Sequence, residues 1–174
     1  MALHVHSFFY FPFVVVFFMA PSLSQPQAAG SCNGILLSYV YTGGSQLPPN
    51  VSDPAEQPYR FSSTLTVLNN GLEELRSWRV FVGFQHGEWL VSASNAVLAD
   101  GMSLPGSVEN GTVLSGETVR DLKTAVATAG DLNQMQVRVD MLGTLLGVAP
   151  PSVPMPSSVT LANDGFLCGQ PSGQ

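Results

Sequence analysis

Residues Met135 to Leu142 read MQVRVDML, the cleanest alternation of apolar and polar side chains in the sequence. Successive side chains of a β-strand point to opposite faces, so a period of two separates an inward set from an outward set. The inward set is Met135, Val137, Val139 and Met141, and the outward set is Gln136, Arg138 and Asp140. The stretch therefore predicts a strand with one face in a core and the other in solvent.

Similar strand patterns recur along the chain, separated by turns rich in Gly and Asn. The longer ones are Ile35 to Tyr41, Phe61 to Leu68, Ser77 to Phe84 and Trp89 to Ser94, and shorter apolar pieces lie at 97–99, 112–114 and 159–161. Many short strands with little helix predict an all-β, immunoglobulin-like β-sandwich. A mixed α+β fold is the alternative.

One stretch departs from the strand pattern. Asp121 to Ala129 carries Leu122, Ala125 and Val126 at helical spacing. Asp121 is a candidate N-cap, and Gly130 is a candidate end. We therefore expect at most one short helix, inserted in a connection between strands.

The composition describes an acidic chain of one domain. It has 174 residues, 6 Lys and Arg against 12 Asp and Glu, and a net charge of −6. Nucleic-acid binding needs clustered cations, whereas the basic residues here are scattered along the sequence. These are Arg60, Arg76, Arg79, Arg120, Lys123 and Arg138. We therefore expect no nucleic-acid partner.

The start of the chain has the pattern of a secretory signal peptide. Phe8 to Ala20 is an uncharged apolar run of thirteen residues, followed by small and polar residues. A membrane span needs about 20 apolar residues, so the run is too short for one. We predict a signal peptide over residues 1–30, cleaved after Ser24 or after Gly30, then one sandwich over 31–169 and a tail over 170–174. A buried N-terminal strand or an anchor helix is the alternative, and no transmembrane segment is expected in the mature chain.

Export changes how cysteines and sequons are interpreted. Cys32 and Cys168 lie near the two ends of the mature chain, and an even pair in an oxidising compartment predicts a disulfide. The alternative is that each cysteine pairs outside this chain. Asn50-Val51-Ser52 and Asn110-Gly111-Thr112 are acceptor sequons for N-glycosylation, although Asn110-Gly111 also fits a simple hairpin turn.

The sequence offers little for catalysis or metal binding. His86 is the only histidine beyond residue 6, and we expect it to be a solvated loop residue. A nucleophilic triad or a zinc site needs several converging ligands or bases, and no such cluster is present in the sequence. We expect no cofactor, no metal and no enzymatic activity. A glycan-active enzyme would need two carboxylates that face each other across a groove.

Exposed aromatic side chains are the best candidates for a function. Planar rings stack on the apolar faces of sugars, so an exposed aromatic on a sheet predicts carbohydrate binding. The candidates are Trp89, which begins a strand, Phe81, which lies opposite the core face of its strand, and the tyrosines Tyr59, Tyr39 and Tyr41. Trp78 shares a face with Val80, and we expect it in the core.

Long runs of the sequence resemble the COBRA-like family of plant cell-wall proteins. They include SWRVFVGFQHGEWLVSASNAVLADG at 77–101, NGILLSYVYTGG at 33–44, AGDLNQMQV at 129–137 and TLANDGFLC at 160–168. The resemblance covers nearly the whole mature chain and fits the N-terminal module of the longer members. The chain lacks the Cys-rich centre of the COBRA domain and a hydrophobic C-terminal anchor signal.

The resemblance implies a secreted protein of the cell wall or the outer face of the plasma membrane, usually glycolipid-anchored, that helps to orient cellulose microfibrils. It also implies a sandwich similar to family-2 carbohydrate-binding modules, in which Cys32 and Cys168 fit the disulfide near both termini. We therefore expect a non-enzymatic wall module that contacts cellulose or a related glucan through Trp89, Phe81 and Tyr59. The alternative is an interaction domain that packs on a COBRA domain or another wall protein without binding glycan.

Overall fold

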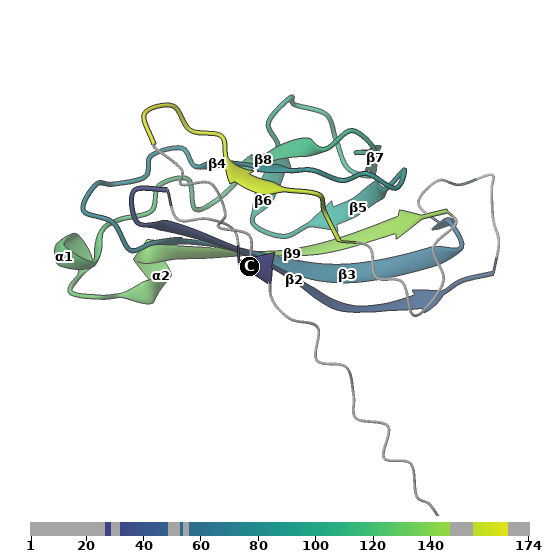
Figure 1. Cartoon of the computed structure of the whole chain (residues 1–174), viewed down its shortest axis with the longest axis horizontal. Helices are drawn as coiled ribbons and strands as arrows, with labels where there is room; N and C mark the ends of the chain where they lie inside the picture. Colours follow the sequence, from purple (N-terminus) through teal and green to yellow (C-terminus); the bar gives the residue numbers. More distant parts are fainter. Residues whose placement is uncertain (1–26, 29–31, 49–52, 54–55, 147–154, 167–174) are drawn as a thin grey trace, which may run out of the picture.

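The computed structural model describes residues 27–28, 32–48, 53, 56–146 and 155–166. Its strands form two antiparallel sheets (Figure 1). The first sheet has the order β1 (Gln27–Ala28), β2 (Ile35–Gln46), β3 (Tyr59–Asn69), β9 (Gln136–Leu145), β5 (Trp89–Ala93) and β7 (Gly106–Ser107). The second has the order β10 (Val159–Leu161), β4 (Arg79–Val82), β8 (Thr112–Gly116) and β6 (Ala96–Leu98).

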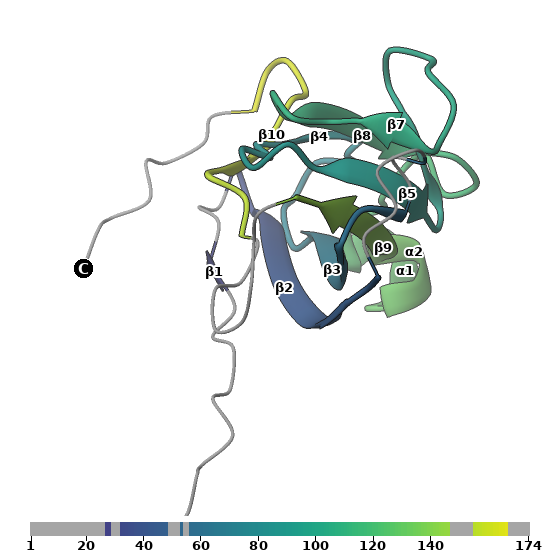
Figure 2. The ribbon, with the colours of Figure 1, turned by 90° about the vertical axis from the view of Figure 1, so that its right-hand side faces the viewer.

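The two sheets stack face to face and enclose one apolar core. Figure 2 shows β4, β8 and β10 over β2, β3 and β9. In β9, Val137, Val139 and Met141 are buried while Arg138 and Asp140 are exposed, as the alternation predicts. The prediction of an all-β sandwich is confirmed.

The prediction of at most one short helix is wrong. The structure has two single-turn helices, α1 (Ala125–Thr128) and α2 (Leu132–Met135), at one end of the sandwich (Figure 1). Thr124 caps α1, because the preceding residues are held in extended conformation by the Leu75–Leu122 bridge. Val126 consequently faces solvent and not the core. Neither helix of the described part is long and apolar enough to cross a membrane.

Tyrosine burial predicts a loss of stability at alkaline pH. Burial, with a smaller contribution from the Glu88 carboxylate, raises the pKa of Tyr39 to about 12. Burial and the 2.6 Å contact with the Tyr59 hydroxyl also raise the pKa of Tyr41. In the unfolded chain the Tyr39 phenol ionises at about pH 10. The contribution of Tyr39 to the free energy of unfolding is therefore fully retained below that pH, and it falls by about 1.4 kcal/mol per pH unit towards about pH 12.

Urea unfolding followed across this range measures the effect. Tyr39→Phe removes the ionising hydroxyl, and we expect it to flatten the pH dependence of the free energy of unfolding. An unchanged slope in Tyr39→Phe would show that Tyr39 does not set the alkaline limit.

Candidate functional site

The structure separates the predicted sugar-stacking residues. Phe81 lies on β4 in the second sheet, between the fully buried Val80 and Val82, so its ring is on the outer face of that sheet. Trp89 lies on β5 in the first sheet, next to the buried Leu90, and its ring is on that sheet's outer face. The two outer faces are on opposite sides of the sandwich. Trp89 and Phe81 therefore do not form one platform.

Tyr59 is not available for stacking, and that prediction is wrong. Its side chain points inward from β3 and is only 3% exposed. Its hydroxyl pairs with the hydroxyl of Tyr41 at 2.6 Å. The ring therefore has no free face for a sugar.

Trp89 has mainly polar neighbours on its face. It is half-buried, and its cross-strand partners are Ser107 of β7 and Thr144 of β9, which in turn pairs with Arg60 of β3. None of the other described strand residues on this outer face is aromatic. Trp89 is therefore an isolated aromatic ring near one edge of this sheet, and its role in sugar stacking stays a prediction.

Phe81 lies over glycine backbone on the second sheet. A Cβ atom added to Gly111 would lie 2.6 Å from Cζ of Phe81, and one added to Gly83 would lie 3.3 Å from its Cε1. The ring is half-buried and has Val113 and Thr160 as cross-strand partners. Only residues without side chains leave room for the ring to lie in this position. The sequence pattern predicts that Phe81 points outward. Of the two glycines against its ring, Gly83 follows β4 directly, whereas Gly111 comes from the turn before β8.

Two adjoining hollows extend along the outer face of the second sheet. One, of about 380 Å³, contains Phe81, and the other, of about 410 Å³, lies above Trp78. They share Arg79 and Ala99 in their walls. We call their exposed polar and aromatic lining the sheet-2 groove, made of Arg79, Phe81, Asp100, Thr112, Ser115 and Arg120.

Trp78 connects this groove to the core. Its ring is fully buried, as predicted, and its Nε1 donates a hydrogen bond to the Val119 carbonyl at 2.7 Å. Its backbone N–H donates to the carbonyl of Arg120 at 3.0 Å. A buried core residue therefore donates two hydrogen bonds to the backbone of the loop that carries Arg120.

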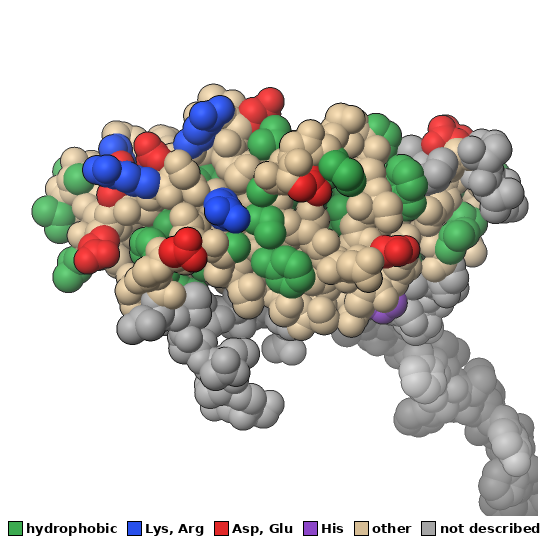
Figure 3. Space-filling model, turned by 90° about the horizontal axis from the view of Figure 1, so that it is seen from above, with side chains coloured by type: hydrophobic (Ala, Val, Ile, Leu, Met, Phe, Trp, Pro, Cys, Tyr) green, Lys and Arg blue, Asp and Glu red, His purple; other side chains and the backbone are tan. Residues whose placement is uncertain are grey.

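Four of the six basic residues come together in the fold, namely Arg76, Arg79, Arg120 and Lys123. Figure 3 looks onto the side of the second sheet, and the Lys and Arg side chains lie in one half of the view, whereas Asp and Glu are spread across it. Arg76 (3.4 Å) and Lys123 both pair with Glu74, and the Lys123 ammonium holds the pKa of that carboxyl below its usual value. Arg79 and Arg120 form no ion pair with a residue in the described ranges.

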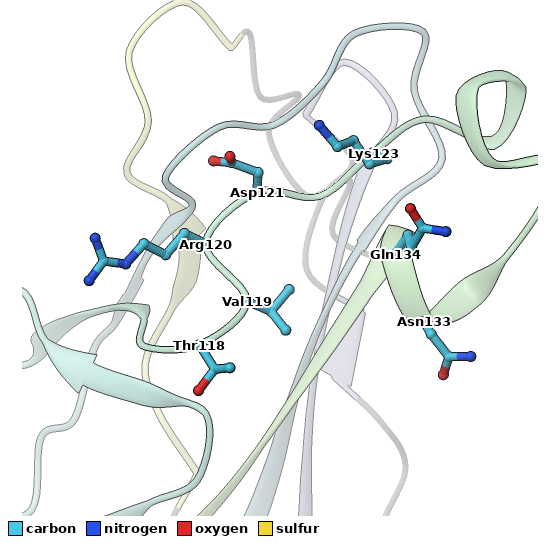
Figure 4. A pocket seen from close by; sticks show the side chains of 7 residues that line it. All are labelled: Thr118, Val119, Arg120, Asp121, Lys123, Asn133 and Gln134. Atoms are coloured by element: carbon cyan, nitrogen blue, oxygen red, sulfur yellow. The ribbon is translucent and has the colours of Figure 1, made fainter.

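A third hollow, of about 400 Å³, lies between the 118–123 loop and α2 (Figure 4). Arg120 and Lys123 both line it, but their charged groups lie well apart in the view, with the Asp121 carboxylate between them. Asp121 is engaged, because its carboxylate accepts the backbone N–H of Ser77 at 2.8 Å. The basic groups do not converge here, so the sheet-2 groove is the better candidate site.

His86 has a partner that the sequence does not reveal. Its ring is exposed, and its Nδ1 lies 3.2 Å from a carboxylate oxygen of Glu88, which is only 1% exposed. The other Glu88 oxygen accepts the His86 backbone N–H at 2.6 Å. In the part of the chain that the structure describes, no three His, Cys, Asp or Glu side chains come close enough to hold a metal ion.

The remaining predicted modification sites are only partly described. Asn110 is exposed in the turn that precedes β8. Cys32 is buried and is not a free thiol, but Cys168, Asn50 and the predicted signal peptide lie outside the described residues. The Cys32–Cys168 disulfide and both glycans therefore stay predictions.

Comparisons with known proteins confirm the resemblance to COBRA-like proteins. The chain is 63% identical over 137 residues to COBRA-like protein 7 and 54% identical over 155 residues to COBRA-like protein 9, both of Arabidopsis thaliana. These matches cover 79% and 89% of this chain but 20% and 23% of the relatives, so the chain spans about a fifth of their length. No family model matches the chain.

A solved structure is also similar to the fold. It is the solution structure of the cellulose-binding family 2 carbohydrate-binding domain from ScLPMO10C, at 17% sequence identity and a TM-score of 0.40. The match covers 74% of this chain and 95% of that domain.

Proposed function

We propose that this chain, a homologue of part of the COBRA-like proteins, is a secreted, non-enzymatic cell-wall module that contacts cellulose or a related glucan. In this proposal it contributes to cellulose microfibril organisation and oriented growth, at the cell wall or the outer face of the plasma membrane. The homology to COBRA-like proteins 7 and 9 supports the family context. The predicted signal peptide, disulfide and glycans belong to the same proposal.

The observation that carries the proposal is the seating of Phe81 in the sheet-2 groove. Its ring lies against Gly111 and Gly83, and hydrogen-bonding side chains of Arg79, Asp100 and Thr112 surround it. Sugar recognition combines an aromatic ring with a few polar groups that bond to hydroxyls, and this hollow provides both. Phe81 is therefore preferred over Trp89 as the stacking residue.

The groove also supports a binding role over a hydrolytic one. Among the described residues, Asp100 is the single carboxylate in the walls of the two hollows, and it accepts the backbone N–H of Met102 at 2.9 Å. Glycoside hydrolysis by the usual route needs a second carboxylate across the scissile bond. We therefore propose that the groove holds a glucan without cleaving it.

A depletion isotherm on crystalline cellulose tests the proposal. We expect saturable binding by the chain, weakened by about 1–3 kcal/mol in Phe81→Ala if sugar stacking resembles base stacking on aromatic residues. Trp89→Ala, an aromatic deletion on the opposite face, is the matched control and should bind like the parent chain. All the tested proteins also carry Asn110→Gln, which removes a predicted N-glycosylation site. Gly111 and Thr112 of that sequon line the hollow, so a glycan on Asn110 would lie beside it.

Loss of binding in Trp89→Ala but not in Phe81→Ala would move the contact to the first sheet. Absence of binding by a folded chain would contradict glucan contact altogether.

A second candidate function is an interaction domain that packs on a COBRA domain or another wall protein. Three apolar side chains at the helix end of the sandwich favour it, because Leu72, Val126 and Leu132 are 89%, 85% and 58% exposed. Contiguous patches of exposed apolar groups mark protein contacts, and these three residues are the candidates for one at this end. A folded chain that fails to bind cellulose would favour this function.

A further inference from the structure

Two arginines of the sheet-2 groove lack an acidic partner. Arg79 and Arg120 line the same hollow, and neither forms an ion pair with any residue that the structure describes. Guanidinium groups stay charged at every physiological pH, and two of them beside one hollow repel each other. An anion bound between them would relieve that repulsion.

The backbone holds both arginines in place. The Arg79 N–H donates to Oδ1 of Asn163 at 2.7 Å, and the Arg79 carbonyl accepts the N–H of Ala162 at 2.8 Å. The Arg120 carbonyl accepts the N–H of Trp78 at 3.0 Å. Both side chains therefore start from hydrogen-bonded backbone, and the Arg120 Nε also donates to the Glu117 carbonyl at 3.4 Å.

Arg79 and Phe81 are adjacent on one face of β4. They are two residues apart in a strand, which separates their Cα atoms by roughly 7 Å along the chain. A polysaccharide that lies along β4 would therefore stack one sugar on Phe81 and present a neighbouring sugar to Arg79 and Arg120. Asp100, on the Phe81 side of the groove, repels a carboxylate there and directs the charged group towards the arginines.

We infer that the sheet-2 groove binds a polyuronate, a polysaccharide whose sugars carry carboxylates, with Arg79 and Arg120 on a carboxylate and Phe81 under a sugar ring. This inference rests on the proposed glycan-binding function and names a further ligand for the same groove. Arginine forms bidentate hydrogen bonds with carboxylates, which fits this role. The chain has a net charge of −6 and repels polyanions as a whole, so such binding has to come from a local arrangement.

The test measures binding of the oxidised chain to polygalacturonate, to its methyl ester and to crystalline cellulose. The methyl ester keeps the sugar backbone and removes the charge. Arg79→Gln/Arg120→Gln is compared with Arg76→Gln/Arg138→Gln, which removes the same net charge from positions outside the groove. Circular dichroism and urea unfolding confirm that each variant is folded.

We expect the chain to bind polygalacturonate more tightly than its methyl ester, and more weakly as salt increases. Arg79→Gln/Arg120→Gln should weaken this binding by about fivefold to tenfold, as two exposed charge pairs would. The control pair should stay within about twofold of the parent chain for polygalacturonate, and its cellulose binding should be unchanged.

The outcomes separate the inference from the proposed function. Cellulose binding without preference for polygalacturonate over its ester would overturn the inference and leave the proposed function intact. An equal loss in both double variants would overturn the inference, since it would show a response to net charge alone. Polygalacturonate binding that depends on Arg79 and Arg120, without cellulose binding, would support the uronate site and overturn the glucan function.

Discussion

Replacing Trp78 by alanine is expected to lower the free energy of unfolding by about 3–5 kcal/mol, the usual cost of removing a large aromatic ring from a core. The side chain is fully buried between the sheets. Its Nε1 also holds the Val119 carbonyl at 2.7 Å, and a Cβ on Gly116 would lie 2.8 Å from that nitrogen. The substitution therefore removes both apolar contact and a hydrogen bond that positions the 118–121 loop.

Urea unfolding at neutral pH measures this loss, and Trp78→Phe separates its two parts. Phenylalanine keeps most of the apolar surface but leaves the Val119 carbonyl without its donor, so we expect a smaller loss of about 1–3 kcal/mol. A change of less than about 1 kcal/mol in Trp78→Ala would contradict the role of Trp78 as a core residue, because core truncations cost more.

Replacing Gly34 by alanine is expected to lower the free energy of unfolding by about 2–4 kcal/mol. Two costs add up, because alanine is strained in a left-handed backbone conformation and its Cβ overlaps neighbouring atoms in a packed region. Asn33 and Gly34 have φ values of 48° and 88°. They lie between Cys32 and Ile35, whose backbone N–H and C=O groups bond to each other in both directions, as in a type I′ turn. A Cβ at Gly34 would lie 2.5 Å from Cα of Gly71. Because that neighbour is backbone, the end of β3 would have to move.

Gly101→Ala is the matched control for this prediction. Gly101 has a similar φ of 80°, but a Cβ there meets no atom within 4 Å. We expect Gly101→Ala to lower the free energy of unfolding by about 1–2 kcal/mol, because only the left-handed backbone conformation is strained. Equal losses of stability in the two variants would show that the approach of Gly34 to Gly71 contributes nothing.

Alternation in the sequence predicts which side of each strand is buried, and it succeeds for Trp78 and for the β9 stretch. It does not show which sheet a strand joins. Phe81 and Trp89 both point outward from their own strands, yet β4 and β5 belong to different sheets, so the rings lie on opposite sides of the molecule. Only the strand pairing reveals this separation.

The sheet-2 groove depends on contacts between distant segments, which explains why the sequence does not reveal it. The Leu75–Leu122 bridge brings residues 76–79 next to residues 120–123, and this pairing turns scattered cations into neighbours. The same bridge keeps Leu122 in an extended conformation, so the N-cap of the helix is Thr124 and not Asp121 as predicted. Tyr59 fails as a binding residue for a related reason, because β3 is central in its sheet and its inward residues are core.

A titration of the isotopically labelled chain with a soluble cello-oligosaccharide, followed by backbone amide NMR shifts, tests the central claim most directly. The proposal predicts saturable shifts confined to β4, β8 and the 97–100 and 111–115 segments around Phe81. Shifts on the outer face of β5 and β9 around Trp89, or no shifts in a folded chain that is saturated with ligand, would contradict it.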